Sequence, residues 1–182
     1  MITYVLLAVV AILIVWFWAT YNGFVRLTQH VKEAWADIDV QLKRRYDLIP
    51  NLVETVKGYA AHEAGTLEKV TEMRTRAMNA TAPADKADAE NMLSGALKSL
   101  FAVSENYPNL KANEQFRDLQ AQLEGTENRI AVARKRYIDS VSTYNKEVRS
   151  FPTNLTAKFL GLKTREAFAV AEEVKKAPKV EF

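Results

Sequence analysis

Residues 4–19 read YVLLAVVAILIVWFWA, an unbroken apolar and aromatic run within a first segment, 1–25, that has no charged side chain. An α-helix rises about 1.5 Å per residue, so the roughly 20 residues at 2–21 span about 30 Å, the thickness of a bilayer's hydrocarbon core. A cleaved secretory signal would have a basic start, a shorter apolar stretch and small residues before its cleavage site. The sequence has none of these, so we expect residues 1–22 to be retained as one transmembrane anchor.

Basic residues lie on the C-terminal side of this anchor. Arg26 and Lys32 follow it closely, and Lys43, Arg44 and Arg45 come further along. Loops rich in Lys and Arg tend to stay in the cytoplasm. The asymmetry therefore favours a single-pass protein of the cell (inner) membrane with its large domain in the cytoplasm.

The composition favours helices and excludes several kinds of chemistry. Gly and Pro are scarce, at 6 and 5 residues, and residues with high helix propensity are abundant. With no cysteine, the chain has no disulfide, no thiolate metal ligand and no cysteine nucleophile. The net charge is only +3, from 25 basic and 22 acidic residues, so we expect no nucleic-acid partner.

Apolar residues continue at helical spacing after the anchor, which predicts one long helix with a buried face. They are Phe24, Leu27, Val31, Ala34, Ile38, Leu42, Tyr46, Ile49, Val53, Val56 and Ala60, followed by Leu67, Val70, Met73 and Ala77. Pro50 lies within this series, removes one hydrogen bond and clashes with the carbonyl of Tyr46. We expect a kink there, with Asn51 as a neighbouring amide able to bond freed backbone groups.

Two turn-forming segments, 79–85 (NATAPAD) and 106–109 (NYPN), divide the remaining chain. A second helix with Ala89, Leu93, Leu97 and Leu100 on one face is expected between them. Asn113 is a suitable N-cap for a third long helix, whose apolar residues recur without a fault from Phe116 to Phe151. A short helix at 154–160 should end at Gly161, and residues from Lys163 are expected to form one more amphipathic helix before the tail.

These elements predict an all-α protein. An N-terminal transmembrane helix continues into a long antiparallel bundle of three long helices plus a short C-terminal one. The expected domains are the anchor at 1–22, the helical bundle at 23–162, and a short helix and tail at 163–182.

No residue pattern is typical of an active site. His62-Glu63 begins like a zinc-protease motif, but Thr66 stands where the second His is needed. A di-iron bundle would need Glu three residues before each His, where the chain has Leu27 and Tyr59. We therefore expect no catalytic residue, no cofactor and no metal.

The basic run 43–45 has two interpretations, contact with anionic lipid and ion pairing. Lys43 lies about 25 Å beyond Arg26 along a straight helix, more than a Debye length at physiological salt. Pairs within the helix, Asp39 with Lys43 and Arg44 with Asp47, or pairs between subunits are the simpler interpretation.

Five apolar residues of the first long helix lie off its main stripe: Trp35, Val40, Leu48, Leu52 and Tyr59. A helix that is apolar around more than one face must bury the surplus against something. Part of this surplus can pack within the bundle. The rest suits self-association or a membrane partner, so we predict homo-oligomers formed through long helices lying side by side.

The segment 34–60, AWADIDVQLKRRYDLIPNLVETVKGYA, resembles the signature of the LemA family of bacterial membrane proteins. Further pieces fit the same pattern: YPNLKA at 107–112 with Phe116, TENRI at 126–130 with Arg134, and Tyr144-Asn145 followed by Phe151-Pro152. One departure is Tyr137-Ile138, where the family usually has Tyr-Asn.

The resemblance implies a single-pass membrane protein with an all-α domain and no established enzymatic activity or cofactor. Some relatives help to build magnetosome membranes, and others are associated with envelope-stress proteases. The first hypothesis is therefore a non-enzymatic, membrane-anchored helical scaffold that self-assembles and organises or remodels the membrane. The alternative is an adaptor or regulator of another membrane protein, such as an envelope-stress protease. The expected partners are the lipid bilayer, further copies of the chain and other membrane proteins.

Overall fold

The computed structural model describes residues 1–60 and 62–166, and the regular secondary structure in them is helical throughout. The helices are α1 (Ile2–Lys57), α2 (Ala64–Asn79), α3 (Pro83–Ser104), α4 (Pro108–Ala112), α5 (Glu114–Arg149) and α6 (Thr153–Phe159). The all-α class and the long apolar N-terminal helix are confirmed. The described chain forms two compact units: residues 1–37 with 133–166 (unit 1), and residues 38–132 (unit 2). Helices α1 and α5 contribute to both.

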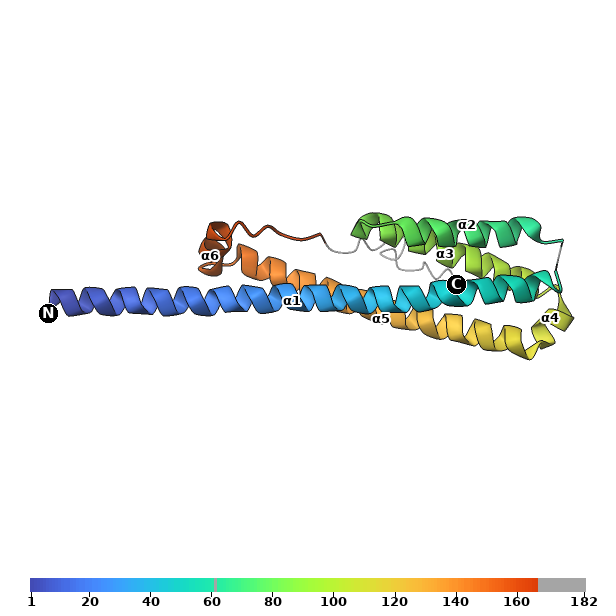
Figure 1. The fold of residues 1–182 in the computed structure, drawn as a ribbon, viewed down its shortest axis with the longest axis horizontal. Coiled ribbons are helices and arrows are strands. Elements are labelled where there is room, and N and C mark those ends of the chain that lie inside the picture. The colour runs from blue at the N-terminus through green and yellow to red at the C-terminus, as the bar shows by residue number, and fades with distance from the viewer. Residues whose placement is uncertain (61, 167–182) are drawn as a thin grey trace, which may run out of the picture. The chain divides into compact units, whose positions relative to one another are not determined.

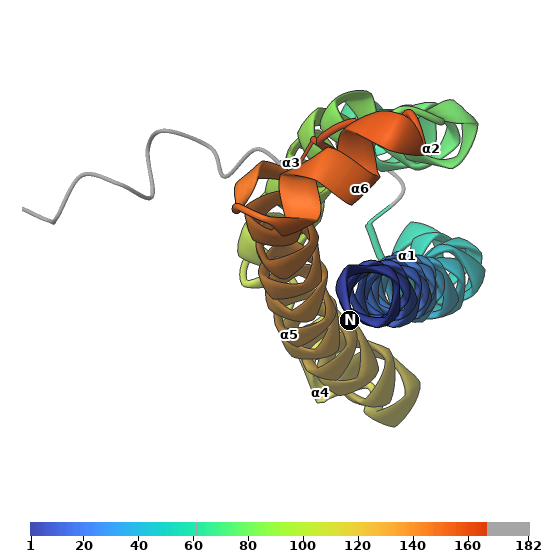
Figure 2. The ribbon, with the colours of Figure 1, turned by 90° about the vertical axis from the view of Figure 1, so that its left-hand side faces the viewer.

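Unit 1 is built from the first part of α1, the last part of α5 and α6. Aromatic rings join its helices edge to face, with Phe24 and Tyr144 6.4 Å apart and Trp35 and Tyr137 5.2 Å apart between ring centroids. Such pairs add about 0.5–1.5 kcal/mol to the burial of the rings themselves. Helix α6 crosses the direction of α5 (Figure 2).

Unit 2 packs the second part of α1 with α2, α3, α4 and the first part of α5. Helices α2 and α3 lie side by side and run in opposite directions (Figure 1), because only three residues connect them. The core consists of the apolar faces that the spacing predicts, and its fully buried members include Ile38, Leu42, Ile49, Val56, Val70, Leu93, Leu100, Phe116 and Ile130. Burying one such side chain stabilises a fold by about 1.5–3 kcal/mol.

The prediction that the first helix runs on to Ala77 is wrong. Helix α1 ends at Lys57, and α2 begins only at Ala64. Gly58 follows α1 directly, and the Tyr59 amide bonds the Val56 carbonyl three residues back at 3.0 Å, so the chain turns there. The turn makes α2 a separate helix that packs with α3, so Leu67, Val70 and Ala77 are buried. In the described part of residues 38–132 the long helices are therefore α1, α2, α3 and α5, where the sequence predicted three.

Two helix boundaries form as predicted. The Asn113 side-chain oxygen accepts a hydrogen bond from the Phe116 amide at 2.8 Å and caps α5. After α6, Gly161 takes a φ of +66°, and the Leu162 amide bonds the Ala157 carbonyl at 2.9 Å. This left-handed residue is why glycine suits the position.

The expected helix from Lys163 does not begin in the described residues. Residues 162–166 are not helical, and the rest of that segment, 167–182, lies outside the described residues.

Helix α1 runs through Pro50 without ending. Proline leaves the Tyr46 carbonyl without its usual amide partner. The Arg74 Nε of α2 donates a hydrogen bond to that carbonyl at 2.8 Å. The side chain that bonds the freed carbonyl therefore comes from another helix, while Asn51 itself is exposed.

Candidate functional site

Residues 2–18 of α1 are apolar on almost every side, and the rest of unit 1 leaves most of their side chains exposed. Large side chains along this stretch are about half to four-fifths exposed, from Ile2 at 80% through Leu6 at 60% and Ile12 at 66% to Trp18 at 66%. By length and composition, α1 is the helix in the described residues that could cross a membrane. Soluble proteins do not leave such a surface in water, so this segment is built for an apolar environment.

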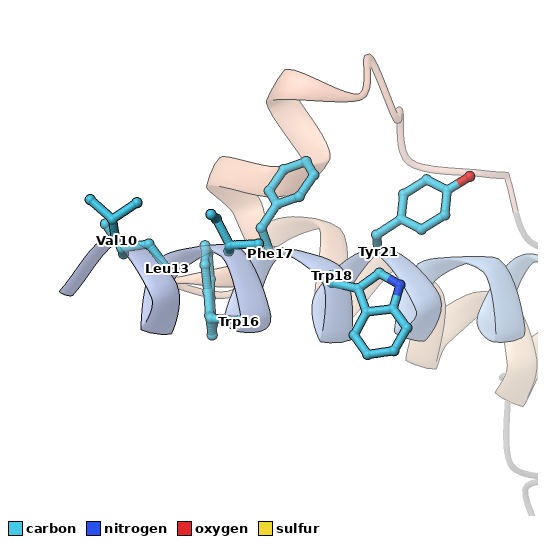
Figure 3. Close-up of a pocket in the computed structure, with 7 residues that line it drawn as sticks. Val10, Leu13, Trp16, Phe17, Trp18 and Tyr21 are labelled. Carbon is cyan, nitrogen blue, oxygen red and sulfur yellow. The ribbon is translucent and has the colours of Figure 1, made fainter. Parts of the chain in front are cut away.

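Aromatic side chains gather where this apolar segment ends. Phe17 and Tyr21 project from one side of α1, and Trp18 projects from another (Figure 3). Together with Val10, Leu13, Ile14 and Trp16 they line an open, almost wholly apolar hollow on the helix surface. Trp and Tyr at one end of an apolar helix are typical of the zone where hydrocarbon meets the headgroups.

Helix α6 continues this apolar surface within unit 1. The rings of Phe17 and Phe159 meet edge to face with centroids 5.6 Å apart. A second apolar hollow is lined by Trp16 and Phe17 from α1 and by Leu155, Thr156 and Phe159 from α6.

Unit 2 contains a buried polar cluster. Arg45 is only 3% exposed and Glu90 is 0% exposed. The Arg45 guanidinium lies 3.2 Å from a Glu90 carboxylate oxygen and 2.8 Å from one of Glu127, and it donates to the Ser94 hydroxyl at 2.8 Å. The Tyr46 hydroxyl donates a hydrogen bond to the other oxygen of Glu90.

Burial and the Glu90 carboxylate together raise the pKa of Tyr46 well above its ordinary value, with Arg45 opposing them weakly. Burial disfavours the charged phenolate, and a neighbouring carboxylate disfavours it further. The phenol therefore remains a hydrogen-bond donor to Glu90. Because the cluster's groups satisfy one another, its arrangement stabilises the packing of α1, α3 and α5 in unit 2.

The predicted ion pairs within the basic run are wrong in their partners. Lys43 pairs with Asp47 at 2.8 Å, and Asp39 pairs with Lys86 of α3 at 2.7 Å. Of the three basic residues 43–45, only Arg45 is buried, and the sequence had suggested no ion-pair partner for it. A signal was present in the sequence, since Arg45 lies three residues after Leu42 and four before Ile49 and so shares their buried face. Glu90 likewise lies three residues before Leu93.

The five candidate interface residues have different environments. Leu52 lies in the core at 0% exposure, and Trp35 packs on Tyr137 within unit 1. Leu48 is half-buried, whereas Val40 and Tyr59 are 62% and 46% exposed. The Tyr59 hydroxyl accepts a hydrogen bond from Asn113 at 3.0 Å. Surface available to a partner therefore remains at Val40, Tyr59 and part of Leu48.

Neither histidine belongs to a metal-binding cluster within the part of the chain that the structure describes. His30 lies 3.4 Å from the Glu33 carboxylate on the exposed side of α1.

Asn145 has a role that the sequence only hinted at. Its side-chain amide donates to the Arg165 carbonyl, and its oxygen accepts from the Arg165 amide, both at 2.8 Å. The Tyr144 hydroxyl donates to the Lys163 carbonyl at 3.2 Å. This pair on α5 holds the segment that follows α6.

The sequence profile of the LemA family matches residues 34–182. The chain belongs to the LemA family. Magnetosome proteins MamQ 1 and MamQ 2 of Paramagnetospirillum magneticum are each 28% identical to this LemA-family chain over 81% of its length. Protein LemA of Metamycoplasma hominis is 26% identical over 83% of the chain. The matches cover 64% of each MamQ protein and 69% of the Metamycoplasma protein. These relatives and the apolar helix together support membrane association.

Proposed function

We propose that this LemA-family chain is a membrane-anchored, non-enzymatic helical scaffold that self-assembles and organises or remodels the membrane. The observation that carries the proposal is that the buried charged side chains pair with one another, whereas the exposed side chains at the start of α1 are apolar. The most buried charged residues, Arg45 and Glu90, satisfy each other and Tyr46. Residues 2–18 of α1, by contrast, expose a long run of large apolar side chains. The chain therefore offers a membrane an attachment surface, while its buried charges serve its own packing.

The proposed location is the cell inner membrane, crossed once by α1, with the large domain in the cytoplasm. This orientation follows from Arg26 and Lys32 just beyond the apolar segment. The magnetosome proteins among the relatives are consistent with work at a membrane.

Self-assembly is proposed to use the exposed apolar positions of α1, chiefly Val40. The test exploits the absence of cysteine from the chain, because a single introduced thiol is then the only one present. The full chain carrying Val40→Cys is reconstituted in lipid vesicles and treated with a short bifunctional maleimide. Val132→Cys is the matched control, since that valine is 53% exposed on α5.

A scaffold gives particles of several copies by light scattering and efficient cross-linking at Val40. A monomer in lipid at all concentrations would contradict the proposal. A monomer that enlarges only when another membrane protein is added would instead favour the adaptor function.

A further inference from the structure

Three large apolar side chains stand exposed on and next to α6: Phe151 at 80%, Leu155 at 56% and Phe159 at 79%. Within α6, Leu155 and Phe159 are four residues apart and so lie on one side of the helix, and Phe151 stands in the turn just before it. The opposite side carries Thr156 and Ala157, which are each 2% exposed. Helix α6 is therefore amphipathic: Thr156 and Ala157 are buried, whereas Leu155 and Phe159 are exposed beside the aromatic end of α1.

The apolar side of α6 is continuous with the surface of α1 that is built for lipid. Phe159 meets Phe17, and Leu155 shares a hollow with Trp16 and Phe17. Phe17 lies near the C-terminal end of the apolar run, about 14 Å along the helix before Arg26. A membrane that covers α1 up to its aromatic end therefore reaches α6 as well.

Charge around α6 suits anionic headgroups. Residues 148–165 contain four basic side chains, Arg149, Lys158, Lys163 and Arg165, and no acidic one. Lys158 and Lys163 are exposed. Basic residues beside an apolar helical face are typical of helices that lie in the plane of the membrane surface.

The position of α6 is fixed by contacts within unit 1. The segment after it is bonded to Tyr144 and Asn145, and the Arg165 guanidinium lies 5.2 Å from the centre of the Tyr144 ring. These contacts therefore hold α6 in place with Leu155 and Phe159 exposed.

We propose that α6 is an interfacial helix. Phe151, Leu155 and Phe159 enter the same leaflet as the aromatic end of α1, at the boundary between headgroups and acyl chains, and Lys158 and Lys163 contact anionic headgroups. The occupant of this surface is the bilayer. The inference rests on the proposed membrane attachment of α1 and adds a second contact that sets how close unit 1 lies to the lipid.

The test places an environment-sensitive fluorophore on single cysteines in the full chain, reconstituted in phosphatidylcholine vesicles containing phosphatidylglycerol. Labels are compared at Leu155→Cys, at Val10→Cys within the apolar run, and at Val132→Cys in unit 2. Phe151→Cys, in the turn just before α6, is a second site in case the Leu155 variant is poorly folded. Nitroxide lipids quench the label either near the headgroups or deep in the acyl chains.

The proposal predicts blue-shifted emission at Leu155 with quenching mainly by the shallow nitroxide, deep quenching at Val10 and none at Val132. Quenching at Val10 without quenching at Leu155 would overturn the α6 inference and leave the anchor intact. No quenching at Val10 would overturn the proposed function itself. Emission at Leu155 that is blue-shifted but not quenched would mean that protein covers α6, which also contradicts the proposal.

Charge reversal tests the headgroup contact separately. Lys158→Glu with Lys163→Glu is expected to lower the shallow quenching at Leu155 in vesicles with phosphatidylglycerol and to change it less in phosphatidylcholine alone. Lys98→Glu, an exposed lysine of α3, is the control and should change neither. Equal loss in both kinds of vesicle would contradict a role for anionic headgroups.

Discussion

Helix α1 has two halves whose side chains suit different surroundings, lipid for the first and a packed helical bundle in water for the second. Before Trp18 nearly every side chain is apolar and exposed, so no face is distinguished from another. From Ile38 onward one narrow face is buried, and that face includes the charged Arg45 among Leu42 and Ile49. In a bundle the buried face specifies which helices pack together, whereas in lipid apolar character alone is sufficient. The contrast predicts different responses to the same substitutions.

The largest difference is expected for charges placed on each half. Val10→Arg with Ile14→Arg puts two cations near the middle of the apolar run, at about 2.5–3.5 kcal/mol each. Together they approach the total favourable transfer free energy of the run. We expect the variant to be extracted from membranes by alkaline carbonate while the unmodified chain stays in the pellet.

The control for this prediction is Val40→Arg with Val132→Arg, two exposed valines of unit 2. Both should leave extraction unchanged. Retention of the Val10, Ile14 variant in the pellet would mean that the first half of α1 does not rely on lipid.

The next effect concerns the buried cluster. Arg45→Met removes the cation facing Glu90 and is expected to lower the free energy of unfolding by about 3–5 kcal/mol, because a carboxylate remains buried without its partner. Chemical denaturation in mild detergent, followed by circular dichroism, measures the change. Lys43→Met breaks an exposed pair two residues away and should cost only about 0.3–0.5 kcal/mol. Similar costs for the two variants would refute the assignment of Arg45 to the core.

A smaller loss of stability is expected when Arg74 no longer donates its hydrogen bond to the Tyr46 carbonyl, which Pro50 deprives of its usual amide donor. Arg74→Met should lower the free energy of unfolding by about 1–3 kcal/mol, since a half-buried carbonyl loses its donor. Pro50→Ala restores an amide that can bond the same carbonyl, so the cost of Arg74→Met should be smaller in that background. A double-mutant cycle with no coupling would show that Arg74 acts in some other way.

The smallest effect is a pH dependence. The pKa of Tyr46 is raised in the folded protein, so the unfolded chain loses this phenolic proton first, near pH 10. The raised pKa of Tyr46 therefore adds its whole contribution to the free energy of unfolding below pH 10, and this contribution is lost as the pH rises above 10. Between pH 10 and 11 the unmodified protein should lose up to about 1.4 kcal/mol more than Tyr46→Phe.

Tyr107 and Tyr137 also have raised pKa values, the first through its hydrogen bond to Glu63 and the second through burial. Both are present in the unmodified protein and in the variant, so the difference isolates Tyr46. Parallel pH profiles would contradict the buried contact with Glu90.

Patterns of apolar residues predicted most of the fold but could not predict the polar interior. The series from Phe24 to Ala60, the Asn113 cap and the Gly161 end all depend on local spacing and backbone conformation, which a sequence displays directly. The end of α1 at Lys57 was missed because apolar residues stay in phase on both sides of the turn. Arg45 and Glu90 were missed because charged residues are usually exposed, and only their shared position with Leu42 and Leu93 indicates otherwise.

The role of α6 depends on contacts between residues far apart in the sequence. No spacing rule connects Phe17 with Phe159 or Asn145 with Arg165. The oligomer interface stays a prediction, with Val40 and Tyr59 as its exposed candidates.

The central claim is that α1 passes from lipid into water along its own length. It is tested most directly by the reaction of a membrane-impermeant maleimide with Val10→Cys and Val40→Cys in inside-out membrane vesicles. The account predicts that Val40→Cys reacts readily and that Val10→Cys reacts only after the membrane is dissolved and the protein denatured. Rapid reaction at Val10→Cys in sealed vesicles would contradict it.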